Sequence, residues 1–182
     1  MQSMAPKTLV GYASANGSTR GVAEAIARVL TRNGVEVDLR SLSDEPRAGD
    51  YHRIVLGSAI HNRAWLPVAE RYVRGMREAL GAADVWLFSV GLGPMLRGPI
   101  GRRLGRVIPP KIDELRTMVG ARDHRLFAGV FPREGVSLGA RVLFRAIGGG
   151  GRYGDFRDWD EIEAWAAEIA LATSEFGTNA HG

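Results

Sequence analysis

The first thirty residues place a loop of small polar residues between a short apolar run and a helical pattern. A helix N-terminus carries unpaired backbone N–H groups and the positive end of the helix dipole. Ser14, Ser18 and Thr19 add hydroxyl donors to the loop, and Gly17 permits a tight turn. The pattern therefore predicts a strand–loop–helix unit that holds an anion such as a phosphate. The predicted anion-binding residues are Ser14, Ala15, Asn16, Gly17, Ser18 and Thr19.

The composition of this loop excludes two common nucleotide-binding motifs. The triphosphate loop ends in Gly-Lys-Ser or Gly-Lys-Thr, and the dinucleotide fingerprint is Gly-x-Gly-x-x-Gly. Residues 12–19 contain no lysine and only one glycine. A helix start capped by one serine or threonine is the simpler interpretation. Because one cap does not need three hydroxyls and a glycine, a monophosphate site is favoured.

Short apolar or β-branched runs alternate with helical patterns along most of the chain. The strand-like runs cover residues 7–13, 35–40, 53–58, 84–90 and 124–131, and the helical patterns cover 18–32, 66–80 and 159–173. Such alternation is typical of a parallel sheet with helices on both faces. We expect one α/β domain over residues 1–182, a three-layer sandwich with strand order 2-1-3-4-5, and flexible segments at 1–6 and 174–182. The ligand should lie at the carboxyl ends of the first, third and fourth strands.

The last helical pattern is the best marked. Asp158 and Glu161 have the spacing of a capping box, and Asp160 adds negative charge to the first turn. The apolar side chains that share one face of this helix are expected to lie in the core. They are Ile162, Trp165, Ala166, Ile169 and Ala172.

The loop and several later segments resemble a known family. Tyr12, Ser14, Gly17, Thr19, Ala23 and Ile26 match the spacing of the flavodoxin signature. In flavodoxins this loop binds the phosphate of FMN, and Gly11 stands where a larger apolar residue is usual. The rest of residues 7–173 resembles one branch of the family, the FMN-dependent protoporphyrinogen oxidases that pass electrons to a quinone. The segments that carry this resemblance are Gly57-Ser58-Ala59-Ile60-His61, Phe127-Ala128-Gly129 and Gly154-Asp155-Phe156-Arg157-Asp158-Trp159.

The resemblance implies a flavodoxin-like fold in which two further loops hold the flavin ring. These loops follow the third and fourth strands, and glycines in the second would let the backbone approach the ring edge. Trp65 could stack on the ring or serve as a hydrophobic staple for the next helix. His61 and Arg63 could act near the flavin or be ordinary surface residues, and no general acid or base is assigned. The predicted ring-binding residues are Ser58, Ala59, Ile60, His61, Asn62, Arg63, Ala64, Trp65, Ser89, Val90, Gly91, Leu92 and Gly93.

The composition of the chain excludes several kinds of chemistry and bears on its location. The chain has no cysteine, so disulfides, thiol catalysis and iron–sulfur ligation are excluded, and its four scattered histidines suggest no metal site. No apolar run is long enough to cross a bilayer, and the first residues lack an apolar signal core, which predicts a cytoplasmic protein.

The chain carries a net charge of +4, which suits an acidic partner, a carboxylated substrate or an anionic membrane face. Two long connections, residues 91–110 and 132–154, are rich in arginine and apolar residues. Each is interpreted either as a loop packed on the core or as a surface for substrate or membrane. The candidate membrane contacts are Arg97, Arg102, Arg103 and Arg106.

Three functional hypotheses follow. The first is an FMN oxidoreductase that oxidises a porphyrinogen-like or other reduced substrate and reduces a quinone. The second is an electron-transfer protein without a substrate of its own. The third is an interaction module that has lost its flavin, against which the intact hydroxyl loop argues. The phosphate loop would also accept a deazaflavin cofactor. Apart from the charge, nothing in the sequence supports nucleic-acid binding.

Overall fold

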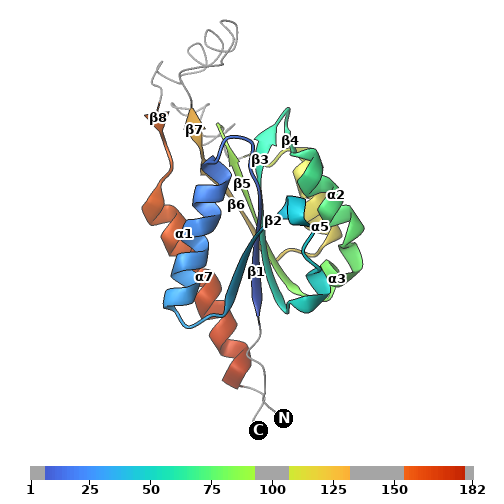
Figure 1. Cartoon of the computed structure of the whole chain (residues 1–182), viewed down its shortest axis with the longest axis vertical. Coiled ribbons are helices and arrows are strands. Elements are labelled where there is room, and N and C mark those ends of the chain that lie inside the picture. Colours follow the sequence, from blue (N-terminus) through green and yellow to red (C-terminus); the bar gives the residue numbers. More distant parts are fainter. Residues whose placement is uncertain (1–6, 93–106, 132–153, 179–182) are drawn as a thin grey trace, which may run out of the picture.

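The computed structural model describes residues 7–92, 107–131 and 154–178, and five parallel strands form their central sheet (Figure 1). These strands are β1 (Thr8–Ala13), β2 (Val37–Ser41), β3 (Arg53–His61), β5 (Asp84–Gly91) and β6 (Asp123–Ala128). They pair in the order β2-β1-β3-β5-β6, which confirms the predicted order 2-1-3-4-5. A short strand, β4 (Ala64–Trp65), pairs antiparallel with β3 and was not predicted. Gly154–Asp155 (β8) pairs with Val130–Phe131 (β7) outside this sheet.

Helices cover both faces of the sheet, as Figure 1 shows, so the expected three-layer α/β architecture is confirmed. On one face lie α1 (Ser18–Arg32) and α7 (Trp159–Thr178). On the other lie α2 (Pro67–Gly75), α3 (Arg77–Gly81) and α5 (Pro110–Met118). Two 3-10 turns, Leu42–Asp44 and Ala48–Asp50, follow β2. Within the described residues, no helix is both long and apolar enough to cross a membrane.

The core has two parts, one on each side of the sheet. On the α1 and α7 side, the rings of Phe88, Phe127 and Trp165 meet edge to face or tilted, with centroids 5.6 to 6.3 Å apart. On the other side, Trp65 packs among leucines, valines and isoleucines from β1, β3, β5 and α5. Such burial of aromatic and aliphatic surface is the main source of stability in a domain of this size.

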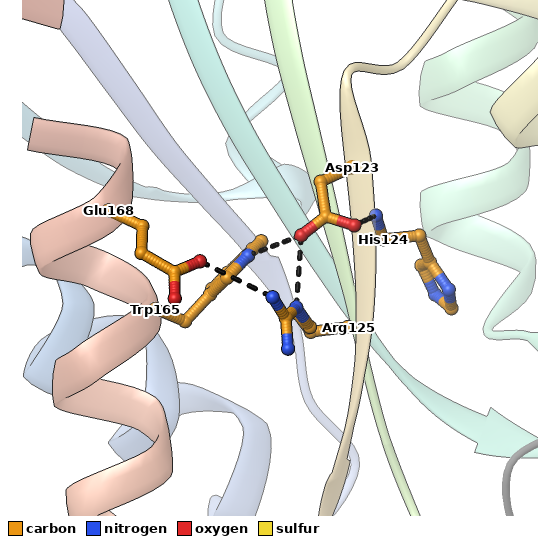
Figure 2. Close-up of polar contacts among 5 residues, drawn as sticks. All are labelled: Asp123, His124, Arg125, Trp165 and Glu168. Carbon is orange, nitrogen blue, oxygen red and sulfur yellow. Dashed lines mark hydrogen bonds and ion pairs between the residues drawn. The ribbon is translucent and has the colours of Figure 1, made fainter. Parts of the chain in front are cut away.

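The last helix docks on β6 through polar contacts that Figure 2 shows. The indole N–H of Trp165 donates to Asp123 Oδ2 at 2.8 Å, and Arg125 Nε donates to the same oxygen at 3.0 Å. Arg125 also reaches Glu168 on α7 at 3.3 Å. Burial alone would raise the pKa of Asp123, but the hydrogen bonds from Arg125 and Trp165 hold it below its usual value. These contacts fix α7 against the edge of the sheet.

The sequence prediction for this helix is confirmed at its start and along its apolar face. Asp158 Oδ1 accepts a hydrogen bond from the backbone N–H of Glu161 at 3.1 Å, which is one half of the predicted capping box. Ile162, Trp165, Ala166 and Ile169 are buried, and Ala172 is partly buried against the same cluster. The helix ends at Thr178 rather than at the expected residue 173.

Three other boundaries differ from the sequence prediction. The expected helix over 66–80 is two helices, because α2 ends at Gly75 and Met76 leaves the helical region with φ −104° and ψ 15°. The expected strand over 124–131 stops at Ala128, and a separate short strand, β7, follows after Gly129. The helix α5 was not predicted at all. Residues 132–153 of the second long connection lie outside the described residues.

Two glycines in the strands are required by neighbouring side chains rather than by their backbone angles. A Cβ on Gly57 would lie 2.0 Å from the ring of Phe88, so only glycine leaves room for this buried aromatic. A Cβ on Gly11 would lie 2.7 Å from Leu42 and 2.8 Å from Leu56. Leu42 and Leu56 therefore occupy the space that the larger residue of the flavodoxin signature would take at position 11.

Candidate functional site

The loop between β1 and α1 is held in shape by its own residues. Gly17 has φ +83°, a left-handed conformation that favours glycine. The backbone N–H of Gly17 donates to Ser14 Oγ at 2.9 Å, which closes the turn. Because Ser14 uses its oxygen as the acceptor, its hydroxyl proton remains able to donate to a ligand.

The start of α1 has the features of an anion site rather than of an ordinary capped helix. No side chain caps this helix, and its first turn contains no acidic residue. Among the described residues, the backbone N–H groups of Ser18, Thr19 and Arg20 have no hydrogen-bond partner. Unpaired donors at the positive end of a 15-residue helix attract a negatively charged group.

The hydroxyl of Thr19 supplies a second and independent indication. Thr19 is fully buried, and its Oγ1 has no hydrogen-bond partner. Buried hydroxyls in proteins are nearly always hydrogen-bonded, since leaving one unpaired costs about 1–3 kcal/mol. An unpaired hydroxyl in the first turn of α1 is a donor that a bound phosphate would satisfy. The residues of the loop therefore fit the phosphate group that the sequence predicted.

The predicted first ring loop is a tight hairpin between β3 and β4. Ile60 pairs with Trp65 and His61 with Ala64, so Asn62 and Arg63 form a two-residue turn. Both turn residues have positive φ, 50° and 61°, as the twist of such hairpins requires. His61, Asn62 and Arg63 are exposed at the carboxyl end of β3. Positive φ at an arginine is unusual and costs free energy, which the hairpin geometry imposes here.

Trp65 is a core residue, which corrects the suggestion that it stacks on a ligand. Its side chain is 2% exposed, and its indole N–H donates to Ser89 Oγ at 2.8 Å. No face of the indole is open to a flat ring. The side chains of two other predicted residues, Ser58 and Ser89, are likewise buried and hydrogen-bonded within the protein. From these three residues only backbone groups are left for a ligand.

Three strand ends meet beside the loop. A Cβ on Gly91, at the end of β5, would lie 3.2 Å from Ile60 in the β3–β4 hairpin. Gly91 O accepts the backbone N–H of Gly129 at 3.1 Å, and a Cβ on Gly129 would lie 3.7 Å from Ser18 Oγ. The structure thus brings the predicted phosphate loop, the hairpin and the end of β5 together at the carboxyl ends of the strands.

Of the residues in the second predicted ring loop, Val90 is buried and Leu92 is exposed, while Gly93 lies outside the described residues.

Sequence reasoning missed two residues near this edge. Arg157, which follows β8, places its guanidinium against the first turn of α1 at Gly21. Gly129 makes the contacts just described. The motif segments that contain both residues were recognised, but nothing in the sequence shows that residues 129 and 157 come close to residues 18–21.

A buried polar chain lies beneath the hairpin. Ser89 Oγ is 2.8 Å from Trp65 Nε1 and also 2.8 Å from His124 Nε2, while His124 Nδ1 is buried without a partner. In Figure 2 the His124 ring points to the opposite side of β6 from Asp123 and Arg125. Burial lowers the pKa of His124 to about 4, helped by the charge of Arg116, so the imidazole is neutral at physiological pH.

A comparison with known protein families identifies the family of this chain. A family model described as a flavodoxin domain matches residues 9–147, which is more than half of the chain. The chain belongs to the flavodoxin domain family. The match includes the loop after β1, the hairpin after β3 and the end of β5, which are the three segments that the structure brings together.

Solved structures show the same fold for this flavodoxin domain. An archaeal flavodoxin has a TM-score of 0.59 with 17% identity, over 92% of this chain and 99% of its own. A Fusobacterium nucleatum flavodoxin described as bound to flavin mononucleotide has a TM-score of 0.57 with 12% identity, over 92% and 98%. Rubredoxin oxygen:oxidoreductase from Desulfovibrio gigas has a TM-score of 0.56 with 15% identity. Here 94% of this chain matches only 37% of the larger protein.

Proposed function

We propose that this flavodoxin domain binds FMN, with the phosphate in the Ser14–Thr19 loop and the flavin ring between the β3–β4 hairpin and the end of β5. The unpaired, buried hydroxyl of Thr19 at an uncapped helix start is the observation that carries this proposal. Bound FMN would supply the redox chemistry, as cofactors of this kind do. The protein would fix the phosphate through Ser14, Thr19 and the first-turn N–H groups, and would hold the ring edge with backbone groups of the hairpin.

We further propose that the substrate is protoporphyrinogen IX or a similar reduced compound, and that a quinone is the electron acceptor. Support comes from the resemblance at segments 57–61, 127–129 and 154–159 and from the net charge of +4, which suits a substrate bearing carboxylates. His61 and Arg63 are exposed on the hairpin, where they could meet such a substrate. Arg97, Arg102, Arg103 and Arg106, outside the described residues, are proposed to contact an anionic membrane face, where a quinone would be available.

The alternative is an electron-transfer protein that has no substrate of its own. The match to an archaeal flavodoxin over nearly the whole length of both chains favours it. A deazaflavin in place of FMN is a variant of either function, because the loop recognises the phosphate and not the ring.

An anaerobic assay separates the two functions. The FMN-loaded protein is mixed with protoporphyrinogen IX and a menaquinone analogue, and porphyrin fluorescence and quinol are recorded together. The proposed function requires that porphyrin and quinol appear in proportion, and that neither appears with FMN-free protein. Reduction of the bound FMN by a flavodoxin reductase, without any porphyrinogen oxidation, would favour the electron-transfer alternative.

A further inference from the structure

The guanidinium of Arg157 lies directly on the first turn of α1, although the two segments are far apart in sequence. A Cβ on Gly21 would lie 2.4 Å from Nη1 of Arg157 and 3.6 Å from its Cζ. No heavy atom approaches a Cβ this closely, so any other residue at position 21 would displace the guanidinium. Glycine at this helical position is otherwise unfavourable, by roughly 1 kcal/mol relative to alanine.

Two neighbours hold the Arg157 side chain in one orientation. Asp155 accepts from Nε at 2.8 Å and from Nη2 at 2.5 Å, and the ring of Trp159 lies 4.4 Å from the guanidinium. The side chain of Arg157 is only 16% exposed. Because Asp155 occupies the Nε and Nη2 edge, the remaining nitrogen, Nη1, faces α1. Among the described residues, Nη1 has no hydrogen-bond partner.

This arrangement puts two positive groups together. The first turn of α1 is the positive end of the helix dipole, has three unpaired N–H groups and contains no acidic side chain. Asp155 offsets part of the charge of this guanidinium through Nε and Nη2, while Nη1, the nitrogen that lies against α1, is left as a donor for an anion. The loop itself has no charged residue, and Arg20, the other arginine of this turn, is exposed and paired with Glu24 at 2.8 Å. Of the two arginines, Arg157 is the one whose guanidinium is mostly buried and held in one orientation beside this turn.

We propose that Arg157 supplies the positive charge of the phosphate site and so selects a phosphorylated flavin over the uncharged riboflavin. The inference rests on the proposed function. Gly21 is the permissive residue, because its missing side chain lets the guanidinium reach the helix. The segment Gly154–Trp159 is thereby assigned a role at the cofactor and not only in starting α7.

The experiment compares Arg157→Gln, Gly21→Ala, the double variant and Arg20→Gln as a charge-matched control. Dissociation constants are measured for FMN and for riboflavin by quenching of flavin fluorescence. Arg157→Gln should weaken FMN binding at least about tenfold, as expected for loss of one charged partner, and change riboflavin binding less than about twofold. Gly21→Ala should do the same by displacing the guanidinium, and the double variant should be no worse than either single one.

Gly21→Ala tests whether a loss of FMN binding comes only from a loss of stability. Alanine favours the helix, so this variant should be at least as stable as the wild type apart from the displaced arginine. Arg20→Gln removes the same charge from the same turn and should leave FMN binding within about threefold, as exposed pairs contribute little. Equal losses from Arg20→Gln and Arg157→Gln, or equal losses for FMN and riboflavin, would overturn the inference.

A wild-type protein that does not bind FMN would defeat the proposed function but not by itself the inference. Backbone amide shifts of residues 14–21 are then followed during titration with inorganic phosphate. Phosphate-dependent shifts in the wild type that Arg157→Gln abolishes would retain Arg157 as part of an anion site. The absence of such shifts in the wild type would reject both.

Discussion

At the scale of single residues, the loop after β1 shows how a hydroxyl can be costly in the free protein and useful in the complex. Thr19 Oγ1 is buried and unpaired, and so is Thr8 Oγ1 at the other end of β1. Both carry the same cost of an unsatisfied hydroxyl. Only Thr19 belongs to the proposed phosphate loop, so the two threonines form a natural comparison.

Thr19→Val should therefore change stability and binding in opposite directions. The FMN-free variant should gain about 1 kcal/mol in unfolding free energy, because valine keeps the shape and removes the unpaired hydroxyl. Its affinity for FMN should fall at least about tenfold, since a hydrogen bond to a charged group is lost. Denaturant unfolding and FMN titration measure the two effects. Thr8→Val should show the same gain without any loss of binding, and a loss of FMN affinity in both variants would refute the assignment of Thr19.

The strand–loop–helix unit at residues 8–32 was predicted correctly because its signal is local. Hydroxyls, a glycine and a following helix lie within residues 12–30, so no tertiary information is needed. The role of Trp65 could not be decided in the same way. The local sequence is the same whether the indole of a tryptophan before a helix faces a ligand or the core. Arg157 was out of reach for a different reason. Its proximity to Gly21 depends on where the end of the chain packs.

At the scale of elements, a buried hydrogen-bond chain connects side chains from three strands. Trp65 of β4 and His124 of β6 both bond to Ser89 of β5. The chain fixes the β3–β4 hairpin, which is the proposed ring-binding element, onto the middle of the sheet. His124 is 9% exposed, so a positive charge on its imidazole would be poorly hydrated.

The pKa of His124 makes stability depend on pH. In the unfolded chain a histidine titrates near pH 6.5, whereas folding lowers the pKa of His124 to about 4. Between these values the unfolded chain binds the extra proton, so stability is highest above pH 6.5 and falls as the pH decreases toward 4. Asp123 and Asp113 partly oppose the lowering, while burial and Arg116 cause it.

We expect the unfolding free energy to fall by about 2 kcal/mol from pH 7 to pH 5 because of His124. Denaturant unfolding at both pH values measures this loss. His124→Gln should remove most of it, although the variant will be less stable at pH 7. His52→Gln, at an exposed position, should keep the pH dependence of the wild type. An unchanged pH dependence in His124→Gln would mean that this histidine is charged in the folded protein.

Strands and helices with a clear hydrophobic pattern were predicted, together with the strand order of the sheet. Short elements with a weak pattern were missed. The five parallel strands and α1 follow from apolar runs and helical spacing. The helix α5 begins at Pro110 after Pro109, a known start signal, but it is short and only Ile112 and Leu115 are buried. The hairpin turn at Asn62–Arg63 lacks the glycine that marks most such turns, so β4 could not be recognised.

At the scale of the whole molecule, the flavodoxin fold and the net positive charge point to different aspects of function. The fold places the loop after β1, the β3–β4 hairpin and the end of β5 at one edge of the sheet. The charge of +4 concerns partners rather than fold, because it favours anionic substrates or surfaces without specifying which. Only the cofactor is common to the oxidoreductase and electron-transfer functions, so it is the central claim to test.

The most direct test is the visible absorption spectrum of the purified protein, followed by mass identification of the chromophore released on denaturation. The account predicts absorption bands at about 375 and 450 nm, and FMN as the released compound. If the protein is purified without cofactor, added FMN should restore these bands and riboflavin should bind more weakly. A single band near about 420 nm would identify a deazaflavin instead. A colourless protein that FMN cannot reconstitute would leave the fold intact and contradict the proposed function.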